Sequence, residues 1–255
     1  MRVSPVIFRL RWARLFCVII PLCLLFAVPC LTLGSEEKSS ALVLSIDGTI
    51  NPAVSDYIRK GFQLAAEQGA ALLIIQMNTP GGLDASMRDI IQEILSSPIA
   101  VVTYVWPDGA RAASAGTYIL YASHVAAMSP ATNLGAATPI QIGGLGDTRE
   151  GKEDEGDAAE DTRSTLEKKV INDASAYIKA LADKHNRNGE WAVEAVQEAV
   201  SLTAREALEL NVINIVAENL EDLLEQLDGF QLSVDGEPVS LITSGVRLNH
   251  FEQSW

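Results

Sequence analysis

Short apolar runs alternate with amphipathic stretches through the first half of the chain. The runs at 41–46, 70–77 and 99–105 have no helical period, which is typical of buried strands in a parallel sheet. Between them, residues 52–68 and 84–95 repeat apolar side chains along one helical face. This alternation predicts an α/β fold with βαβ units and helices packed on a mainly parallel sheet.

The second half of the chain is richer in helical patterns. A capping box is predicted where Thr203 precedes Glu206 by three residues, and Asp235-Gly236 predicts a tight hairpin turn. The elements expected here are a helix at 113–122, a strand at 124–128, helices at 165–185 and 190–200, a helix after Thr203, a strand near 212–216, a helix at 218–227 and a hairpin of 230–234 and 239–243.

An acidic stretch, 143–161, interrupts these patterns. Its part 147–161 contains eight acidic residues against Arg149 and Lys152, and almost nothing apolar. Such a composition predicts a mobile surface loop. A calcium site is the alternative, but the stretch lacks the glycine and carboxylate spacing of an EF-hand.

The first 34 residues have the features of a targeting segment. Four arginines precede the apolar run 15–33, and the small residues Gly34 and Ser35 follow it. This order predicts a signal peptide, while the length of the run leaves an uncleaved membrane anchor open. In either case the rest of the chain is expected on the extracytoplasmic side of a membrane.

Removing 1–34 changes the chemistry that remains. All three cysteines lie in this segment, so the exported part has no thiol, disulfide or cysteine metal ligand. The net charge changes from −14 to −18, because four arginines and no acidic residues are lost. This charge argues against binding to nucleic acids or anionic headgroups. In the rest of the chain, we expect one sizeable α/β domain at 41–228, followed by a C-terminal hairpin and tail at 229–255.

Two motifs of small residues indicate where chemistry could take place. Ser114 has alanines on both sides and a glycine close by, so a carbonyl group could approach its hydroxyl. Gly81 and Gly82 follow a predicted central strand, where ligands of open α/β sheets gather and where free amides can stabilise an oxyanion. Each motif alone has a structural explanation, in helix packing or in a turn. Their coincidence favours acyl-transfer chemistry.

A nucleophilic serine needs a base, and the histidines are weak candidates. The chain has three. His124 opens an apolar strand and is more easily explained as structural. His185 closes a helix, a favourable place for a cation, and His250 lies in the tail. None has an obvious acidic partner, so a Ser-His-Asp triad has no support in the sequence.

Lysine is the other possible base, provided that its amine is neutral. On the helix 165–185, Lys168 and Lys179 fall opposite the apolar stripe, whereas Lys169 lies at its border. Lys169 could therefore reach an interior cleft. The alternative is a surface ion pair with Asp173, one turn further along.

Three segments carry a resemblance to a known family. Residues 78–82 (NTPGG), 109–118 (GARAASAGTY) and 169–172 (KVIN) with 176–178 (AYI) resemble the NfeD family of membrane serine proteases. These are Clp-like, crotonase-fold enzymes related to signal peptide peptidase A. The resemblance implies that Ser114 is the nucleophile and Lys169 its general base, with an oxyanion hole formed by the amides of Gly82 and Ala115.

The same resemblance implies a substrate. The family enzymes are endopeptidases that cleave apolar segments of membrane-associated, stomatin-like proteins without a metal or cofactor. We expect an extended peptide to lie beside Gly81 and Gly82, and a homo-oligomer of two or more subunits. The alternatives are a crotonase-type acyl-CoA enzyme, which an export signal disfavours, and a catalytically silent membrane-protein scaffold.

Overall fold

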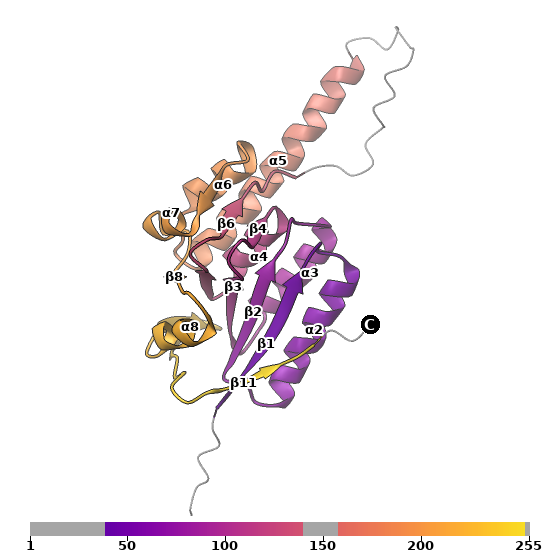
Figure 1. Cartoon of the computed structure of the whole chain (residues 1–255). Coiled ribbons are helices and arrows are strands. Elements are labelled where there is room, and N and C mark those ends of the chain that lie inside the picture. Colours follow the sequence, from indigo (N-terminus) through magenta and orange to yellow (C-terminus); the bar gives the residue numbers. More distant parts are fainter. Residues whose placement is uncertain (1–38, 140–157, 253–255) are drawn as a thin grey trace, which may run out of the picture. The chain divides into compact units, whose positions relative to one another are not determined.

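The centre of the molecule is a six-stranded sheet in which all neighbouring strands run parallel (Figure 1). The computed structural model describes residues 39–139 and 158–252, all of which belong to one compact unit, Lys38–Trp255. In spatial order the strands are β11 (Arg247–His250), β1 (Ser40–Asp47), β2 (Leu72–Asn78), β3 (Ala100–Val105), β5 (Val125–Met128) and β8 (Ile215–Val216). The predicted α/β fold with a mainly parallel sheet is confirmed.

Helices and short strands surround this sheet. The helices are α2 (Pro52–Glu67), α3 (Asp84–Leu95), α4 (Ala115–Ala122), α5 (Ala158–Lys184), α6 (Gly189–Gln197), α7 (Ala204–Glu209) and α8 (Leu220–Leu227). A three-stranded sheet contains β4 (Arg111–Ala113), β6 (Asn133–Gly135) and β7 (Ser201–Thr203), and a hairpin contains β9 (Gln231–Val234) and β10 (Glu237–Ser240). The predicted capping box of Thr203 and Glu206 begins α7.

The main sheet is buried on both faces, which explains its continuous apolar runs. In β1, Leu42 and Leu44 belong to the core beneath α2 to α6, whereas Val43 belongs to the core on the opposite face. That second core includes Leu223 of α8 and Val234 of the hairpin. Figure 1 shows α8 apart from the helices of the first face. Each of the central strands β1, β2, β3 and β5 is thus covered by apolar side chains on both sides, whereas the edge strand β11 is mostly exposed.

The predicted helix 113–122 starts too early. Residues 111–113 form β4, which pairs with β6, and the helix begins only at Ala115. Alanine favours helices, but here the backbone of Ala113 is held by pairing with a distant strand. Because β4, β6 and β7 have three residues each, no alternating pattern could reveal them in the sequence.

The predicted loop 143–161 ends earlier than expected, because α5 begins at Ala158. Alanine and glutamate are strong helix formers and extend the helix into the acidic stretch. The rest of this stretch, 143–157, and the predicted targeting segment, 1–34, lie outside the described residues. Of the helices that are described, none is both long and apolar enough to cross a bilayer.

The predicted C-terminal hairpin is confirmed, with Asp235 and Gly236 both at positive φ in its turn. The chain then returns to the main sheet as β11, which pairs with β1 and was not expected from the sequence. Phe251 follows it and stacks on Tyr57, with ring centroids 5.4 Å apart. Residues after the hairpin therefore contribute to the main sheet.

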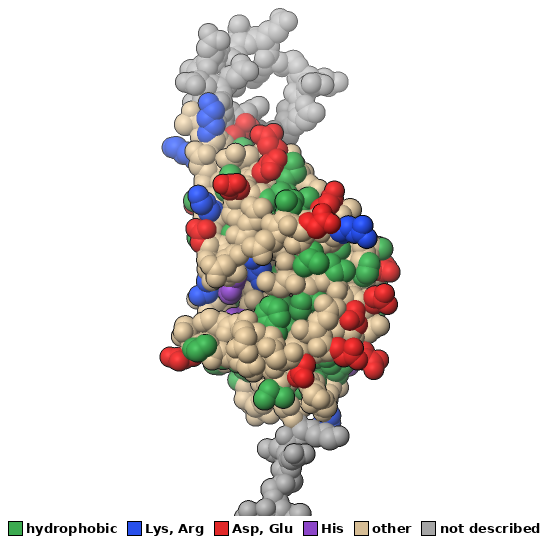
Figure 2. Space-filling model, turned by 90° about the vertical axis from the view of Figure 1, so that its left-hand side faces the viewer, with side chains coloured by type: hydrophobic (Ala, Val, Ile, Leu, Met, Phe, Trp, Pro, Cys, Tyr) green, Lys and Arg blue, Asp and Glu red, His purple; other side chains and the backbone are tan. Residues whose placement is uncertain are grey.

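One face of the molecule shows how the surface charge is distributed (Figure 2). Acidic side chains are scattered over it among apolar patches, and the described basic side chains are few and separated. A nucleic acid binds to continuous positive surfaces, which this face does not offer within the described residues.

Candidate functional site

Ser114 lies between β4 and α4 in a backbone conformation that is rare for a residue with a side chain. Its φ is 53° and its ψ is −117°. The Ser114 N–H donates to the carbonyl oxygen of Gly135 at 3.0 Å, and the Ser114 carbonyl accepts from the Thr117 N–H at 2.9 Å. These bonds hold a turn that costs about 1–3 kcal/mol in isolation. Such stored strain is common where a catalytic side chain must be presented.

The hydroxyl of Thr117 stabilises this turn. It contacts the carbonyl oxygens of Ala112 and Gly135, each at 2.9 Å, and is fully buried. The strand before Ser114 and the strand β6 are thereby joined to the first turn of α4. No motif in the sequence indicated this function of Thr117.

The end of β2 brings the two small-residue motifs together. The Thr79 N–H donates to the carbonyl oxygen of Arg111 at 2.8 Å, and the Ala113 N–H donates to that of Thr79 at 3.1 Å. This short pairing ends just before Ser114 on one strand and just before Gly81 on the other. The two motifs therefore meet at the carboxyl ends of the parallel strands, where the sequence placed the glycine pair.

Neighbouring atoms leave no room for a side chain at Gly81 or Gly82. A Cβ atom on Gly81, whose φ is +110°, would lie 2.6 Å from the Cβ of Ser114 and 3.1 Å from its Oγ. A Cβ atom on Gly82 would lie 2.0 Å from the carbonyl oxygen of Ile50. Any side chain at these positions would push the loop away from the serine or from Ile50.

The amides expected to form an oxyanion hole make no hydrogen bonds within the described residues. The Ile50 N–H donates to the Gly81 carbonyl, and the Leu83 N–H donates to the Ile50 carbonyl, both at 2.9 Å. Because N–H groups alternate in direction along an extended segment, the Gly82 amide faces away from Ile50. Ala115 is the first residue of α4, so its N–H has no acceptor within the helix.

A cavity of about 250 Å³ opens beside Ser114. Its wall is mostly apolar, and its charged lining residues are Arg88 and Asp84. It is lined by Gly82, Leu83, Asp84, Met87, Arg88, Ser114, Ala115, Tyr118, Ala137, Pro139 and Ala174. A cavity of this size and character suits an apolar side chain next to the serine.

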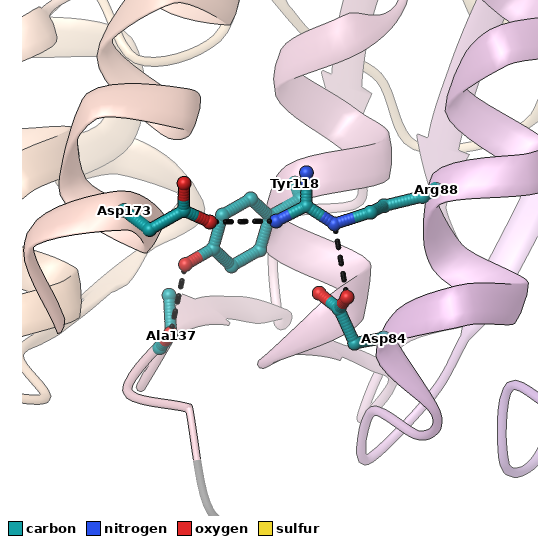
Figure 3. A network of polar contacts seen from close by, with 5 residues as sticks. All are labelled: Asp84, Arg88, Tyr118, Ala137 and Asp173. Atoms are coloured by element: carbon teal, nitrogen blue, oxygen red, sulfur yellow. Dashed lines mark hydrogen bonds and ion pairs between the residues drawn. The ribbon is translucent and has the colours of Figure 1, made fainter. Parts of the chain in front are cut away.

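Figure 3 shows the polar contacts in the wall of this cavity. Arg88 extends from α3 and donates to Asp84 at 2.9 Å and to Asp173 of α5 at 3.1 Å. The Tyr118 hydroxyl donates to the carbonyl oxygen of Ala137 at 3.1 Å, and burial raises the pKa of Tyr118. Tyr118 therefore stays a neutral donor, and the wall joins α3, α4 and α5.

Lys169, the predicted base, lies on α5 with its side chain exposed, and it is not among the residues that line the cavity. The expected stripe on this helix is buried at Ala174 and Leu181 but exposed at Leu166. The alternative ion pair of Lys169 with Asp173 does not form, and Asp173 pairs with Arg88. Ser114 Oγ makes no hydrogen bond within the described residues. The serine and lysine are thus on neighbouring elements without direct contact.

His124 lies at the opposite end of α4 from Ser114. A helix of this length, eight residues, is about 12 Å long. The Nδ1 atom of His124 accepts a hydrogen bond from the Val101 N–H at 3.2 Å. Burial, with the charges of Lys184 and Arg187 nearby, lowers the pKa of His124 to about 4. The structural explanation of this histidine is therefore the correct one.

The expectation for His185 as a cation at a helix end is wrong. Its Nε2 donates to the carbonyl oxygen of Ala122 at 3.0 Å, and burial is the main cause that lowers its pKa to about 3. The cation at this place is Arg187, which is buried and donates to the carbonyls of Tyr121 at 2.9 Å and Ser123 at 2.8 Å. His250, the third histidine, lies exposed on β11.

Sequence reasoning missed Arg88 and Arg187. Arg88 follows Asp84 by four residues, a spacing that indicates a surface ion pair and gives no sign of a second acid on α5. Arg187 lies in a polar segment between two helices, which predicts exposure. Within the described chain, no group of three His, Cys, Asp or Glu side chains could hold a metal ion.

Comparison with known proteins identifies the family. The NfeD1b N-terminal domain matches residues 40–235, more than half of the chain. The chain belongs to this NfeD family. Among curated relatives, it is 36% identical over 222 residues to the membrane-bound protease PH1510 of Pyrococcus horikoshii, and 27% identical over 212 residues to the membrane protein NfeD1b of Bacillus subtilis.

The NfeD chain covers 86% of its own length in the first of these matches and 78% in the second, but it spans less than half of either relative (47% and 43%). Solved structures of the archaeal relative's N-terminal part agree with the fold. A serine-to-alanine mutant of this membrane-bound stomatin-specific protease matches with a TM-score of 0.74 at 36% identity, covering 85% of this chain and 99% of the other. A lysine-to-alanine mutant in complex with a substrate peptide matches with a TM-score of 0.73 at 36% identity, covering 86% and 94%.

Proposed function

We propose that this NfeD protein is a serine endopeptidase in which Ser114 is the nucleophile and Lys169 the general base. The observation that carries the proposal is the strained turn of Ser114, which presents a hydroxyl without a hydrogen-bond partner in the described structure beside the amides of Gly82 and Ala115. The relatives add support, because the solved structures of the archaeal protease include a serine mutant and a lysine mutant bound to a substrate peptide.

In this proposal, Ser114 Oγ attacks the carbonyl carbon of a peptide bond while the Lys169 amine accepts its proton. The amides of Gly82 and Ala115 stabilise the oxyanion, each by about 3 kcal/mol. Lys169 then returns the proton to the leaving amine, and water hydrolyses the acyl-enzyme. The exposed position of Lys169 is compatible with this function, because hydrogen bonds between catalytic groups often tighten only when substrate is bound.

The substrate is an extended, apolar polypeptide. The carbonyl and N–H of Gly82 both face away from Ile50, so they can pair with a peptide strand laid along Gly81 and Gly82. The cavity beside Ser114 accepts an apolar side chain against Met87 and Ala174. By analogy with the stomatin-specific relative, the physiological substrate is a stomatin-like membrane protein.

We also propose the setting of the reaction. The relatives are named as membrane proteins, and the segment 1–34 has the pattern of a signal peptide or anchor. The domain, whose main sheet includes β11 near the C-terminus, then acts on the extracytoplasmic side of the membrane as a homo-oligomer. Its chemistry uses protein groups alone.

The experiment is a cleavage assay with the full chain and a fluorogenic peptide that has an apolar core. Ser114→Ala and Lys169→Ala should each lower kcat/KM by about 10³-fold or more. Lys168→Ala is the matched control, since Lys168 is the neighbouring exposed lysine, and it should remain within about twofold. Circular dichroism and thermal melting establish that each variant is folded.

Three results would contradict the proposal in different ways. Cleavage by Ser114→Ala would exclude this nucleophile. Equal activity of Lys169→Ala and Lys168→Ala would exclude the dyad. A wild-type chain that binds the peptide without cleaving it would favour the scaffold, and turnover of an acyl-CoA thioester alone would favour the crotonase-type alternative.

A further inference from the structure

Arg88 makes an ion pair of a kind that the rest of the described structure lacks. The other ion pairs among the described residues join side chains within one turn of the same helix, such as Asp56 with Lys60. Arg88 also has such a partner, Asp84, but its second partner, Asp173, is on α5. This contact fastens α3 to α5 at the wall of the Ser114 cavity (Figure 3).

The same guanidinium also contacts the next turn of α5. Its central carbon lies 4.4 Å from the ring centroid of Tyr177, a distance that gives a cation–π attraction. Asp173 and Tyr177 are four residues apart and lie on one face of the helix. Tyr177 in turn stacks on Tyr118 of α4, with ring centroids 6.1 Å apart. Arg88 thus holds two successive turns of α5, which fixes the rotation of the helix about its axis.

Lys169 continues this face by one more turn, because it precedes Asp173 by four residues. The first buried residue of α5 is Ala174, and Ile171 before it is partly buried against the core, whereas residues 165–169 are exposed and Leu166 is 50% exposed. The contact of Arg88 with Asp173 therefore lies where α5 passes from its buried part to the exposed residues that include Lys169. Whatever sets the direction of α5 at Asp173 also sets the direction in which Lys169 points.

We propose that Arg88 is a positioning residue for the reaction, which holds α5 so that Lys169 can reach Ser114. Arg88 does not touch the reacting atoms in this account. It acts through Asp173 and Tyr177, and its loss leaves the nucleophile intact while the base is misplaced. This inference rests on the proposed function, since it assumes that Lys169 is the base.

A double-mutant cycle with the full chain tests the contact. Arg88→Gln and Asp173→Asn should each lower kcat by about tenfold while KM changes by less than about twofold, because misplacing a catalytic group slows the chemical step more than it weakens binding. The double variant should lose no more than Arg88→Gln alone, since Asp173→Asn removes an interaction that Arg88→Gln has already removed. Arg59→Gln removes an exposed arginine paired within its own helix and should leave kcat unchanged.

The outcomes separate a positioning function from the alternatives. An unchanged kcat in Arg88→Gln, a loss confined to KM, or losses that multiply in the double variant would overturn the inference. If Arg88→Gln does not fold, the exposed Asp173→Asn gives the same kcat test alone. Each variant is compared with Ser114→Ala, whose loss of activity tests the proposed function separately.

Hydrogen exchange tests whether Arg88 holds α5 to α3, without relying on activity. Amides of 165–177 should exchange several-fold faster in Arg88→Gln than in the wild type or in Arg59→Gln, because the helix is released from α3. Unchanged exchange in this segment would overturn the inference even if the protease activity is present. Faster exchange in a chain that cleaves no peptide would place the failure in the proposed function instead.

Discussion

The two ends of α4 lie about 12 Å apart and differ in how their polar groups are satisfied. At the beginning, the Ser114 hydroxyl and the Ala115 N–H make no hydrogen bonds in the described structure, and Ser114 has a strained backbone. At the end, the carbonyls of Tyr121 and Ser123 accept hydrogen bonds from the buried guanidinium of Arg187. Polar groups at the start of this short helix thus lack hydrogen-bond partners in the described structure, whereas the carbonyls of Tyr121 and Ser123 at its end have them.

This difference follows from the helix dipole. The start of a helix carries partial positive charge and free N–H groups, which suit an anion that forms during a reaction. The end carries partial negative charge, which a cation stabilises. We infer that the start of α4 is organised for chemistry at some cost in stability, and that the end offsets this cost. The three predictions below test that division.

Ser114→Gly gives the largest expected effect. It removes the hydroxyl and should lower kcat/KM by about 10⁴-fold. It also removes the Cβ at a φ of 53°, so that strain of about 1–3 kcal/mol is released. The extra freedom of glycine in the unfolded chain costs about 0.5–1 kcal/mol, so the free energy of unfolding should rise by about 1 kcal/mol. Urea unfolding measures this change.

Ser114→Ala is the matched control for this prediction. It removes the same hydroxyl but keeps the Cβ, and therefore the strain. Its activity should be as low as that of Ser114→Gly, while its unfolding midpoint stays close to that of the wild type. If the two variants were equally stable, the turn at Ser114 would store no strain and the first half of the comparison would be wrong.

Arg187→Met tests the other end. The variant keeps the apolar length of the side chain but removes every donor, which leaves the carbonyls of Tyr121 and Ser123 buried without partners. We expect a loss of about 3 kcal/mol or more in the free energy of unfolding, because unsatisfied buried acceptors are costly. At low temperature the folded fraction should keep the kcat of the wild type, since Ser114 lies beyond the far end of α4.

Arg59→Met serves as the control, because Arg59 is an exposed arginine paired only with Asp56 in its own helix. Its free energy of unfolding should change by less than about 1 kcal/mol. A fall in kcat of the folded Arg187→Met enzyme, at wild-type KM, would mean that the two ends of α4 do not serve separate purposes.

The same contrast explains what the sequence could predict. The strands at 41–46 and 99–105 and the helix at 84–95 are local patterns of apolar residues, so their existence could be predicted and their ends were nearly right. The strands β4, β6, β7 and β11 form because distant segments pair, and their few residues carry no pattern of their own. Fold class is thus accessible from periodicity, while short tertiary pairings are not.

For the candidate site, the place of Gly81 and Gly82 at the end of a central strand could be predicted. The strand before Ser114 could not, because that serine was expected inside a helix. The contacts of Arg88 and Arg187 could not, since an arginine in a helical or polar segment usually lies in solvent. Lys169 could be predicted only in part. Its place on the helix face was predictable, but the direction of an exposed helical turn depends on contacts such as that of Arg88 with Asp173.

The last prediction concerns pH and the histidines at the end of α4. Their pKa values are lowered to about 4 for His124 and about 3 for His185, against about 6.5 in an unfolded chain, chiefly by burial. Above pH 6.5 both states leave them neutral. As the pH falls from 6.5 towards 4, only the unfolded chain binds protons, so the free energy of unfolding must fall. Urea midpoints measured between pH 7 and 5 should decline, before most carboxylates titrate.

His124→Asn with His185→Gln keeps the acceptor and the donor in uncharged form and should flatten the decline. If the decline were equally steep in that variant, the acid sensitivity would arise elsewhere in the molecule.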